Sequence, residues 1–277
     1  MIVWLTGASG LLGGWTRHAL EASGYVVRWE RVDLEDPRAI HKAARAWLPG
    51  AVVHCAAVSA IADCARDPAR ARRVNTAATE AIAVACAEVG ARLVHVSTDL
   101  VFDGEHAPYA EDGPIAPTSV YGRTKAEAER VARAVGDVVI ARMSLLFGPT
   151  RTARRGFFDV QLEALRAGRQ VTLFDDEWRT PLSLRAAAAV LARLVGSDAR
   201  GVLNVAGPER MSRLEMGERL ARVVGVMPAE LRAASRTSAP GEPRPRDLSM
   251  DTTRLRALFG EVSADFEEEC RAMLSAP

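Results

Sequence analysis

The 277-residue sequence has little cysteine, almost no net charge and no hydrophobic run that approaches the length of a membrane span. Its four cysteines form no CxxC pair and are too few for a disulfide framework, so we expect thiols in a reducing compartment and no metal site. Lys and Arg total 36 against 35 Asp and Glu, which gives no electrostatic reason to expect a nucleic acid or a membrane as partner. The N-terminal residues lack the basic segment of a signal peptide. We therefore predict a cytoplasmic protein that acts on a small molecule.

Short apolar runs alternate with amphipathic stretches, a pattern typical of βαβ units around a parallel sheet that is buried on both faces. The pattern predicts six strands, at residues 2–6, 25–29, 51–55, 92–97, 138–143 and 202–205. Helices are expected at about 37–47, 69–89 and 119–135. The predicted fold class is therefore α/β, with a doubly wound parallel sheet.

The alternation loosens after residue 150, where an Arg-rich loop, a helix near 157–167, a strand at 170–174 and a turn-rich segment at 238–246 are expected. Ser212 and Glu215 form a capping box for a helix that reaches about Val224. We predict a first domain at 1–150, to which residues 182–206 return, and a smaller domain formed mainly by 151–277.

The first strand leads directly into three glycines, Gly7, Gly10 and Gly13, and a helical pattern follows. Such a turn points the unpaired N–H groups and the positive dipole end of the helix at whatever lies above them. A dinucleotide pyrophosphate is the usual occupant. The spacing in TGASGLLG differs from GxGxxG, and a small-residue turn is the alternative, but the position behind the first strand favours the cofactor interpretation.

A set of hydroxyl and amine groups follows in a fixed order: Ser97 and Thr98 end a predicted strand, and Tyr121 and Lys125 lie four residues apart on the next long helix. Residues at this spacing share a helix face. There the Lys125 ammonium is expected to lower the pKa of Tyr121, which then exchanges a proton with a carbonyl or alcohol. Thr98 is expected to donate to the reacting oxygen. A YxxxK pair alone is weak evidence for such a site. It gains weight here because the glycine loop, the strand-end hydroxyl residues and the YxxxK pair follow one another in this order.

With these motifs the chain resembles the extended short-chain dehydrogenase/reductases, and within them the branch of dTDP-4-dehydrorhamnose reductases. The resemblance spans nearly the whole chain and rests on TGASGLLG at 6–13, VDLEDP at 32–37, HCAA at 54–57, STDLVFDG at 97–104, PTSVYGRTKAEAE at 117–129 and RPRDLSMDTTRL at 244–255. It implies a Rossmann-type nucleotide-binding domain, a smaller C-terminal substrate domain, and NAD(P)H-dependent reduction of a keto group on a nucleotide-activated sugar.

The family's functional residues fall on matching positions of this sequence. The resemblance implies that Thr98, Tyr121 and Lys125 are catalytic and that Asp99 is an acid on the substrate side. The implied cofactor contacts, together with those expected from the glycine loop and the second strand, are Gly7, Gly10, Leu11, Leu12, Gly13, Arg28, Asp33, Leu34, Ala56, Ala57, Tyr121 and Lys125.

Two positions depart from the family pattern. Leu100 replaces the tyrosine of the family's STDYVF. Leu145, in RMSLLFG of this chain, replaces the aromatic residue that usually follows the family's Arg-Thr-Ser at the end of a strand. Both lie where sugar and nucleotide are expected, so a different keto sugar is an open alternative. Arg179 falls near the family's substrate pocket, where it either clamps a phosphate or carboxylate or is an exposed arginine beside a turn. The arginines at 151, 154 and 155 are expected in a solvated loop.

Cofactor preference depends on the residues after the second strand, because an acid there favours NAD and a basic residue favours NADP. The sequence offers both kinds of residue there, namely Arg28, Glu30 and Arg31, and does not show which of them lies beside the ribose. NADP(H) is favoured and NAD(H) remains the alternative.

Two other functions stay open. One is a sugar-nucleotide epimerase or dehydratase that retains bound NAD. The other is a non-catalytic NADP-binding regulatory subunit that resembles the accessory subunit of methionine adenosyltransferase. A homodimer is a further possibility, although no apolar stripe in the sequence assigns an interface.

Overall fold

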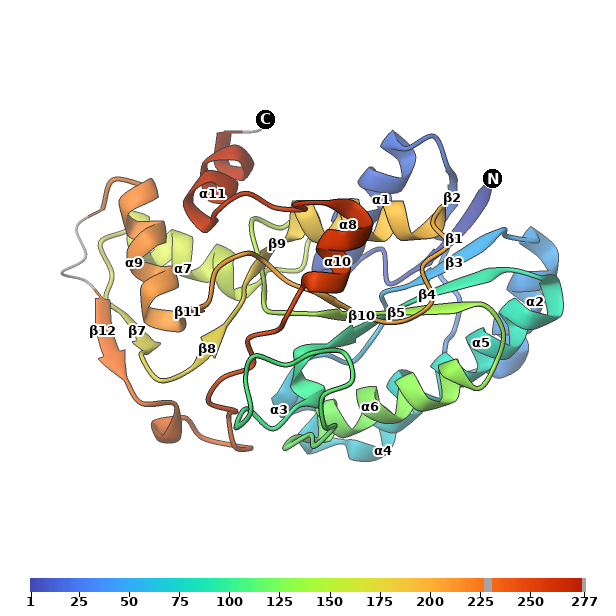
Figure 1. Ribbon diagram of the computed structural model, residues 1–277, viewed down its shortest axis with the longest axis horizontal. Coiled ribbons are helices and arrows are strands. Elements are labelled where there is room, and N and C mark those ends of the chain that lie inside the picture. The colour runs from blue at the N-terminus through green and yellow to red at the C-terminus, as the bar shows by residue number, and fades with distance from the viewer. Residues whose placement is uncertain (227–230, 276–277) are drawn as a thin grey trace.

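The computed structural model describes residues 1–226 and 231–275, and a six-stranded parallel sheet forms its centre (Figure 1). Its order is β2-β1-β3-β4-β5-β10, and the strands are β1 (Ile2–Thr6), β2 (Val26–Arg28), β3 (Ala51–His54), β4 (Arg92–Thr98), β5 (Val138–Met143) and β10 (Gly201–Val205). The chain passes from β1 to β2 on one side and returns to β3 on the other, so the winding reverses between β1 and β3. Ligands of such sheets bind outside the carboxyl ends of the strands at this point. The predicted doubly wound sheet is confirmed.

Helices cover both faces of the sheet, as Figure 1 shows. Val3 and Leu5 of β1 lie in a core with the helices α1 (Leu11–Ala22) and α8 (Leu184–Val195). Trp4, between them in sequence, points to the opposite face and packs in a second core with α2 (Pro37–Trp47), α5 (Ala78–Val89) and α6 (Val120–Arg133). This alternation follows from the two-residue period of a strand and explains why the sequence reads as continuous apolar runs.

The predicted helix over 69–89 is interrupted. The structure has α4 (Pro68–Arg72), a π-helical segment at 73–77, and then α5. A short helix, α3 (Ile61–Arg66), precedes α4. The π-helical segment turns Asn75 into the interior, where its side chain bonds both polar groups of the Val58 backbone. A widened turn at this point is typical of functional sites, and sequence periodicity does not reveal it.

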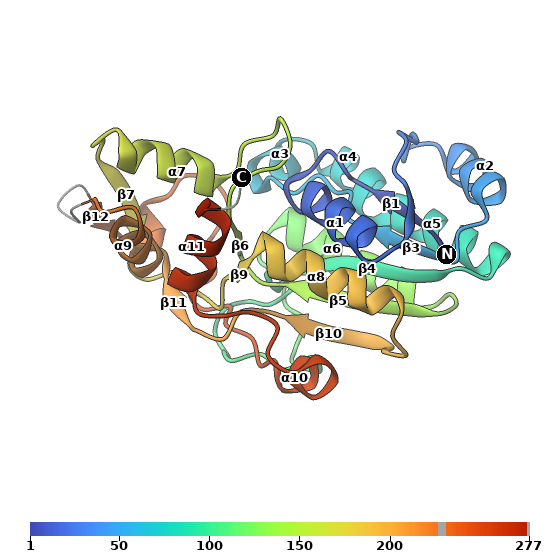
Figure 2. The same ribbon diagram turned by 90° about the horizontal axis from the view of Figure 1, so that it is seen from above.

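A smaller unit follows β5 and lies at one end of the sheet (Figure 2). It is built from three two-stranded sheets, in which β6 pairs with β9, β8 with β11 and β7 with β12. Its core collects apolar side chains from α7, α9 and α11. The bounds of its elements are β6 (Leu146–Phe147), α7 (Phe157–Arg166), β7 (Val171–Phe174), β8 (Trp178–Arg179), β9 (Leu182–Ser183), β11 (Met211–Ser212), α9 (Arg213–Val223), β12 (Leu231–Ala234) and α11 (Phe266–Ser275). The helix α10 (Thr253–Phe259) instead contacts β10, and its Leu255 lies in the core of the central sheet.

The smaller unit is not a simple C-terminal addition, because α8 and β10 return to the central sheet between its two parts. The predicted capping box at the start of α9 is present, with Ser212 and Glu215 bonded reciprocally. Residues 227–230 and 276–277 of the expected second domain lie outside the described residues. Within 1–226 and 231–275, no helix combines the length and apolar character needed to cross a membrane.

Candidate active site

The glycine loop between β1 and α1 is shaped by close backbone contacts. Gly7 has a φ of +74°, and a Cβ at this position would lie 2.6 Å from the amide nitrogen of Ala56. A Cβ at Gly13 would lie 1.9 Å from the Gly7 carbonyl oxygen, so both positions require glycine. The N-cap of α1 is Gly10, which offers no side-chain cap, and the first turn has no acidic residue. The first N–H groups of α1 are therefore available to a phosphate, which fits the dinucleotide expected from the sequence.

A cavity of about 640 Å³ begins at this loop and runs past the end of β2. Its lining combines backbone and side chains from β1, the glycine loop, α1 and the segment after β2, namely Trp4, Leu5, Thr6, Gly7, Ala8, Ser9, Arg17, Trp29, Glu30, Arg31, Val32 and Leu34. An adjoining hollow is lined by residues 31–35 and Val74, and it includes Asp33. Arg28 extends to the Glu30 carboxylate, with 3.0 Å between Nη1 and Oε1, and both side chains are exposed.

The loop after β3 forms the opposite wall of the glycine turn. The amide N–H of Ala56 donates to Oγ1 of Thr6 over 3.3 Å, and Ala57 follows it. Asn75 fixes the next residue, because its Oδ1 accepts from the Val58 amide over 2.8 Å. Its Nδ2 donates to Thr124 Oγ1 on α6 over 3.0 Å. Asn75 therefore ties the expected cofactor loop to the helix that carries Tyr121 and Lys125.

Tyr121 and Thr98 are brought together by an unusually close approach of two backbones. Ser119 caps α6 by accepting from the Gly122 amide over 3.0 Å. A Cβ on Gly122 would lie 2.2 Å from the Leu100 carbonyl oxygen, so only glycine lets the first turn of α6 press against the end of β4. The pKa of Tyr121 is raised by burial, then by the Asp99 carboxylate, while a hydrogen bond with the Thr98 side chain acts in the opposite direction. Tyr121 is thus a neutral phenol at physiological pH.

Lys125 occupies a different position from the one expected. Its side chain is 2% exposed, and Nζ lies 3.2 Å from Nε2 of His95 on β4. Burial lowers the pKa of Lys125 to about 8. Burial also lowers the pKa of His95, followed by the effect of Lys125, so the imidazole is neutral and can accept from the ammonium. The expectation that Lys125 lowers the pKa of Tyr121 is wrong for this structure, because the ammonium is directed to the sheet and the phenol pKa is raised.

A buried ion pair lies one turn further along α6. Glu129 accepts from Arg142 on β5, with 2.7 Å between Nη2 and Oε2, and from the Ser97 hydroxyl over 2.5 Å. The Glu129 and Arg142 side chains are both nearly inaccessible to solvent. Ser97 therefore fixes the base of α6 instead of facing a substrate, and sequence analysis did not identify this pair. A Glu four residues after Lys125 was the available signal.

Asp99 belongs to a second buried network, which reaches into the smaller unit. Its Oδ2 lies 3.5 Å from Nε of Arg179, whose Nη2 lies 3.4 Å from Glu177 Oε1. Glu177 Oε2 also pairs with Arg244 Nη1 over 2.9 Å. Burial raises the pKa of Asp99 to about 6, although Arg179 acts in the opposite direction. Arg179 is thus 5% exposed and engaged by two protein carboxylates, so the exposed arginine considered in the sequence analysis is not what the structure has.

The two departures from the family motif lie in apolar surroundings. Leu100 packs against the cluster of Phe102 and Tyr109, and Leu145 packs against the core of the smaller unit. Both leucines remain partly exposed at the end of the sheet that holds Thr98. At both positions the side chain is aliphatic where the family pattern has an aromatic ring.

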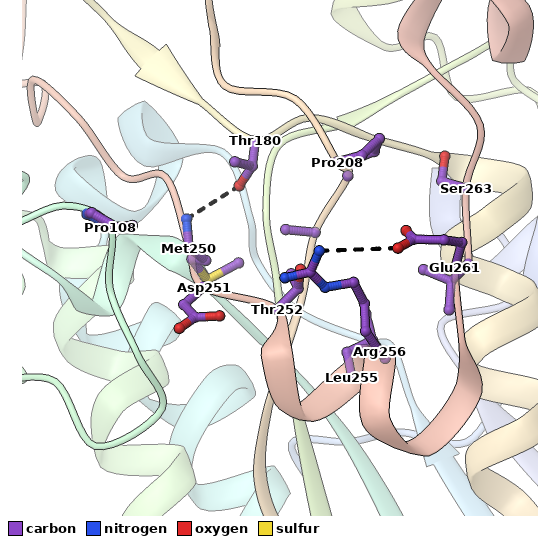
Figure 3. A pocket seen from close by; sticks show the side chains of 13 residues that line it. Pro108, Thr180, Pro208, Met250, Asp251, Thr252, Leu255, Arg256, Glu261 and Ser263 are labelled. Atoms are coloured by element: carbon purple, nitrogen blue, oxygen red, sulfur yellow. Dashed lines mark hydrogen bonds and ion pairs between the residues drawn. The ribbon is translucent and has the colours of Figure 1, made fainter.

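A smaller cavity, of about 250 Å³, lies beside α10 (Figure 3). Thr180 separates it from the Asp99 network, since its Oγ1 accepts from the Met250 amide over 3.3 Å and lies 3.5 Å from Ser144 Oγ. Arg256 and Glu261 face each other across the cavity at 4.0 Å. This cavity contains none of the residues that the sequence analysis assigned to catalysis or cofactor binding.

The chain is similar to known proteins over nearly its whole length. The model of the RmlD substrate binding domain matches residues 1–276. A dTDP-4-dehydrorhamnose reductase of Streptomyces griseus is 33% identical over 268 residues, which cover 92% of this chain and 87% of that protein. The methionine adenosyltransferase 2 subunit beta of Pongo abelii is 27% identical, with 92% and 82% covered. The crystal structure of dTDP-4-dehydrorhamnose reductase from Bacillus anthracis in complex with NADP has a TM-score of 0.92 at 21% identity, with 99% and 98% covered.

Proposed function

The chain belongs to the family defined by the RmlD substrate binding domain, and from this premise we propose that it reduces a keto group on a nucleotide-activated sugar, with Tyr121 as the proton donor. It is an NAD(P)-dependent oxidoreductase of the short-chain dehydrogenase/reductase type. The substrate class follows the relatives named dTDP-4-dehydrorhamnose reductase and the glycan biosynthesis reductase of Haloferax volcanii, which is 28% identical over the whole chain.

Tyr121 is proposed as the proton donor because its phenol lies beside the Thr98 hydroxyl, where α6 approaches β4 closely at Gly122. The phenol and the hydroxyl come from different elements, the first turn of α6 and the end of β4. They converge only because α6 approaches the Leu100 backbone more closely than a side chain would permit. A packing role alone would not require two hydroxyl groups and a carboxylate at the carboxyl end of the central strands.

A nicotinamide cofactor supplies the hydride when it is bound. The protein then has to position the carbonyl and protonate its oxygen. Tyr121 retains its proton because its pKa is raised, and it gives that proton to the developing alkoxide. Thr98 donates to the same oxygen and restricts its position. Lys125 stays protonated below its pKa of about 8 and supplies positive charge at the base of the site.

The cofactor site that we propose extends from the first turn of α1 to the segment after β2. The backbone of Gly10, Leu11 and Leu12 binds the pyrophosphate, and the loop with Ala56 and Ala57 lies beside it. Asp33 and Leu34 lie at the adenine end, where the two adjoining hollows meet. NADP(H) is the preferred cofactor because two arginines, Arg17 and Arg31, line this cavity.

The sugar nucleotide binds in front of Thr98, between the carboxyl end of β4 and the smaller unit. Asp99 and Arg179 form its polar floor as an ion pair, and Leu100 and Leu145 form its apolar wall. Because leucine lacks the polar group of tyrosine, this wall selects for size and apolar character more than for hydrogen bonding.

The test is a titration of the purified protein with NADPH and NADH, followed by addition of dTDP-4-dehydrorhamnose while the absorbance of the reduced nicotinamide is recorded. Oxidation of the cofactor on addition of the sugar nucleotide is the expected result. Cofactor binding without oxidation would direct attention to another keto sugar, and absence of binding would contradict the proposal. Product analysis distinguishes net reduction from the epimerase alternative, which regenerates its cofactor.

The regulatory alternative is favoured by one finding, the 27% identity to the methionine adenosyltransferase 2 subunit beta over 92% of the chain. Thr98, Tyr121 and Lys125 are nevertheless all present, and Tyr121 lies beside Thr98. Turnover with any keto sugar nucleotide would decide against a purely regulatory role. NADPH binding with no turnover across a panel of such sugars would favour it.

A further inference from the structure

The cavity next to the glycine loop has an aromatic side chain at its rim that the core does not use. Trp29 is 47% exposed, whereas Trp4 and Trp15 are buried. Its indole is covered on one side by Arg17 of α1, whose guanidinium carbon lies 4.1 Å from the ring centroid. Burying the exposed part of an indole is favourable, so a ligand that binds in this cavity gains free energy by covering Trp29.

The charges around the cavity favour an anion at the same rim. Glu30 is the acid closest to the end of β2, but Arg28 and the Trp29 amide already bond its carboxylate, over 3.0 and 2.9 Å. Arg17 and Arg31 also line the cavity. With the partners of these groups included, the arginines at 17, 28 and 31 stand against two carboxylates, Glu21 and Glu30, which leaves an excess of one positive charge.

We propose that Arg17 and Trp29 together recognise the adenosine 2′-phosphate end of NADP(H) and determine the preference for it over NAD(H). Trp29 provides the flat surface for the purine, and Arg17 provides a planar cation with several N–H donors for the phosphate. The inference rests on the proposed nicotinamide-dependent function. It assigns the role to α1, whereas the usual determinant is a residue at the end of the second strand.

The position of Arg17 lowers the entropic cost of binding a phosphate. Stacking on Trp29 and an ion pair with Glu21, at 2.8 Å, hold its guanidinium in place before any ligand arrives. A cation ordered in advance loses less conformational entropy on binding a phosphate. An NAD-specific site would instead offer a free carboxylate to the ribose hydroxyls, and Glu30 does not do so because Arg28 engages it.

The experiment is isothermal titration calorimetry with four ligands: NADPH, NADH, adenosine 2′,5′-bisphosphate and 5′-AMP. It is carried out on the full chain, on Arg17→Gln and on Trp29→Ala. Arg193→Gln is the matched control, because Arg193 is also exposed and stacked on an aromatic ring, Phe259, but lies on α8. Thermal melting confirms that each variant is folded.

We expect the unaltered chain to bind the bisphosphate more tightly than 5′-AMP. Arg17→Gln should weaken NADPH and the bisphosphate about tenfold or more, as for loss of a charge-assisted bond, and leave NADH and 5′-AMP within about twofold. Trp29→Ala should weaken all four ligands, with Trp29→Phe restoring most of the loss. Arg193→Gln should change none of them.

Two outcomes would overturn the inference, and they are distinguishable. If the unaltered chain binds both dinucleotides but Arg17→Gln weakens them equally or not at all, the assignment of Arg17 fails and the proposed function stands. If the unaltered chain binds neither dinucleotide, the proposed function fails with it. Because the adenosine ligands lack nicotinamide, the result is independent of catalytic turnover.

Discussion

Replacing Lys125 by methionine should stabilise the protein while it removes activity. The ammonium is 2% exposed, and burial lowers its pKa from 10.5 to about 8. A difference of about 2.5 pKa units at 1.36 kcal/mol each means that burying the charge costs about 3 kcal/mol at neutral pH. Methionine has a similar shape and no charge, so it avoids this cost. Loss of the hydrogen bond to His95 offsets about 1 kcal/mol of the gain.

The sign of the pH dependence follows from the two pKa values. Below pH 8 the lysine is protonated in both the folded and the unfolded chain, and the folded chain bears the full cost. Between pH 8 and 10.5 the folded chain releases the proton first, so its stability rises with pH and the cost disappears. Lys125→Met should therefore be more stable than the original chain by about 2 kcal/mol at pH 7 and less stable by about 1 kcal/mol above pH 10.5, where only the loss of the hydrogen bond to His95 is left.

The assay is urea unfolding at pH 7 and pH 10, followed by circular dichroism, with turnover measured at pH 7. The sequence contains two lysines, and Lys42→Met on the exposed face of α2 is the matched control, with no expected change in stability. A Lys125→Met protein that is less stable at pH 7, or whose gain is the same at both pH values, would refute the reasoning. The stabilised protein should be inactive, since charge at the base of the site is lost.

Three further predictions concern the residues around Thr98. Tyr121→Phe should lower turnover about 100-fold or more while the dissociation constant for NADPH, measured by fluorescence, changes little; unchanged turnover would remove Tyr121 from the mechanism. Gly122→Ala should lower the melting temperature and turnover together, because its Cβ would meet the Leu100 carbonyl at 2.2 Å, and a variant with unchanged melting temperature would contradict the close approach. Burial raises the pKa of Asp99 to about 6, so kcat/KM should fall below pH 6 as the carboxylate is protonated and its ion pair with Arg179 is lost. The pH–rate profile of Asp99→Asn should lack this fall in kcat/KM at low pH.

The central sheet could be predicted from the sequence because parallel strands buried on both faces leave a strong signal. The expected bounds of β1, β5 and α2 match the structure, and the others differ by a residue or two. The second strand is shorter than expected, since β2 lies at the exposed edge of the sheet and Val26 faces solvent. The interrupted helix at 73–77 was not predictable, because it depends on the bonds of Asn75 to a distant loop.

The sequence places Thr98 and Tyr121 near each other, but it does not predict the ion pairs and hydrogen bonds around them. The positions of Thr98 and Tyr121 follow from strand and helix bounds, and the structure brings them to one end of the sheet. The partners of Lys125 and Arg179 depend on residues 30 or more positions away, namely His95 and Asp99, and no local spacing reveals such contacts. The role of Gly122 is likewise visible only when two elements approach each other.

The return of α8 and β10 to the central sheet determines how the polypeptide can be divided. A single cut after residue 150 would leave one edge of β5 without its neighbour and would remove the apolar side chains that cover α1. Neither product would keep an intact interior. Removing the smaller unit would take two separate deletions, one between β5 and α8 and one after β10. Exchange of the smaller unit between relatives must therefore preserve every point at which the chain passes between that unit and the sheet, including those after β5, before α8 and after β10.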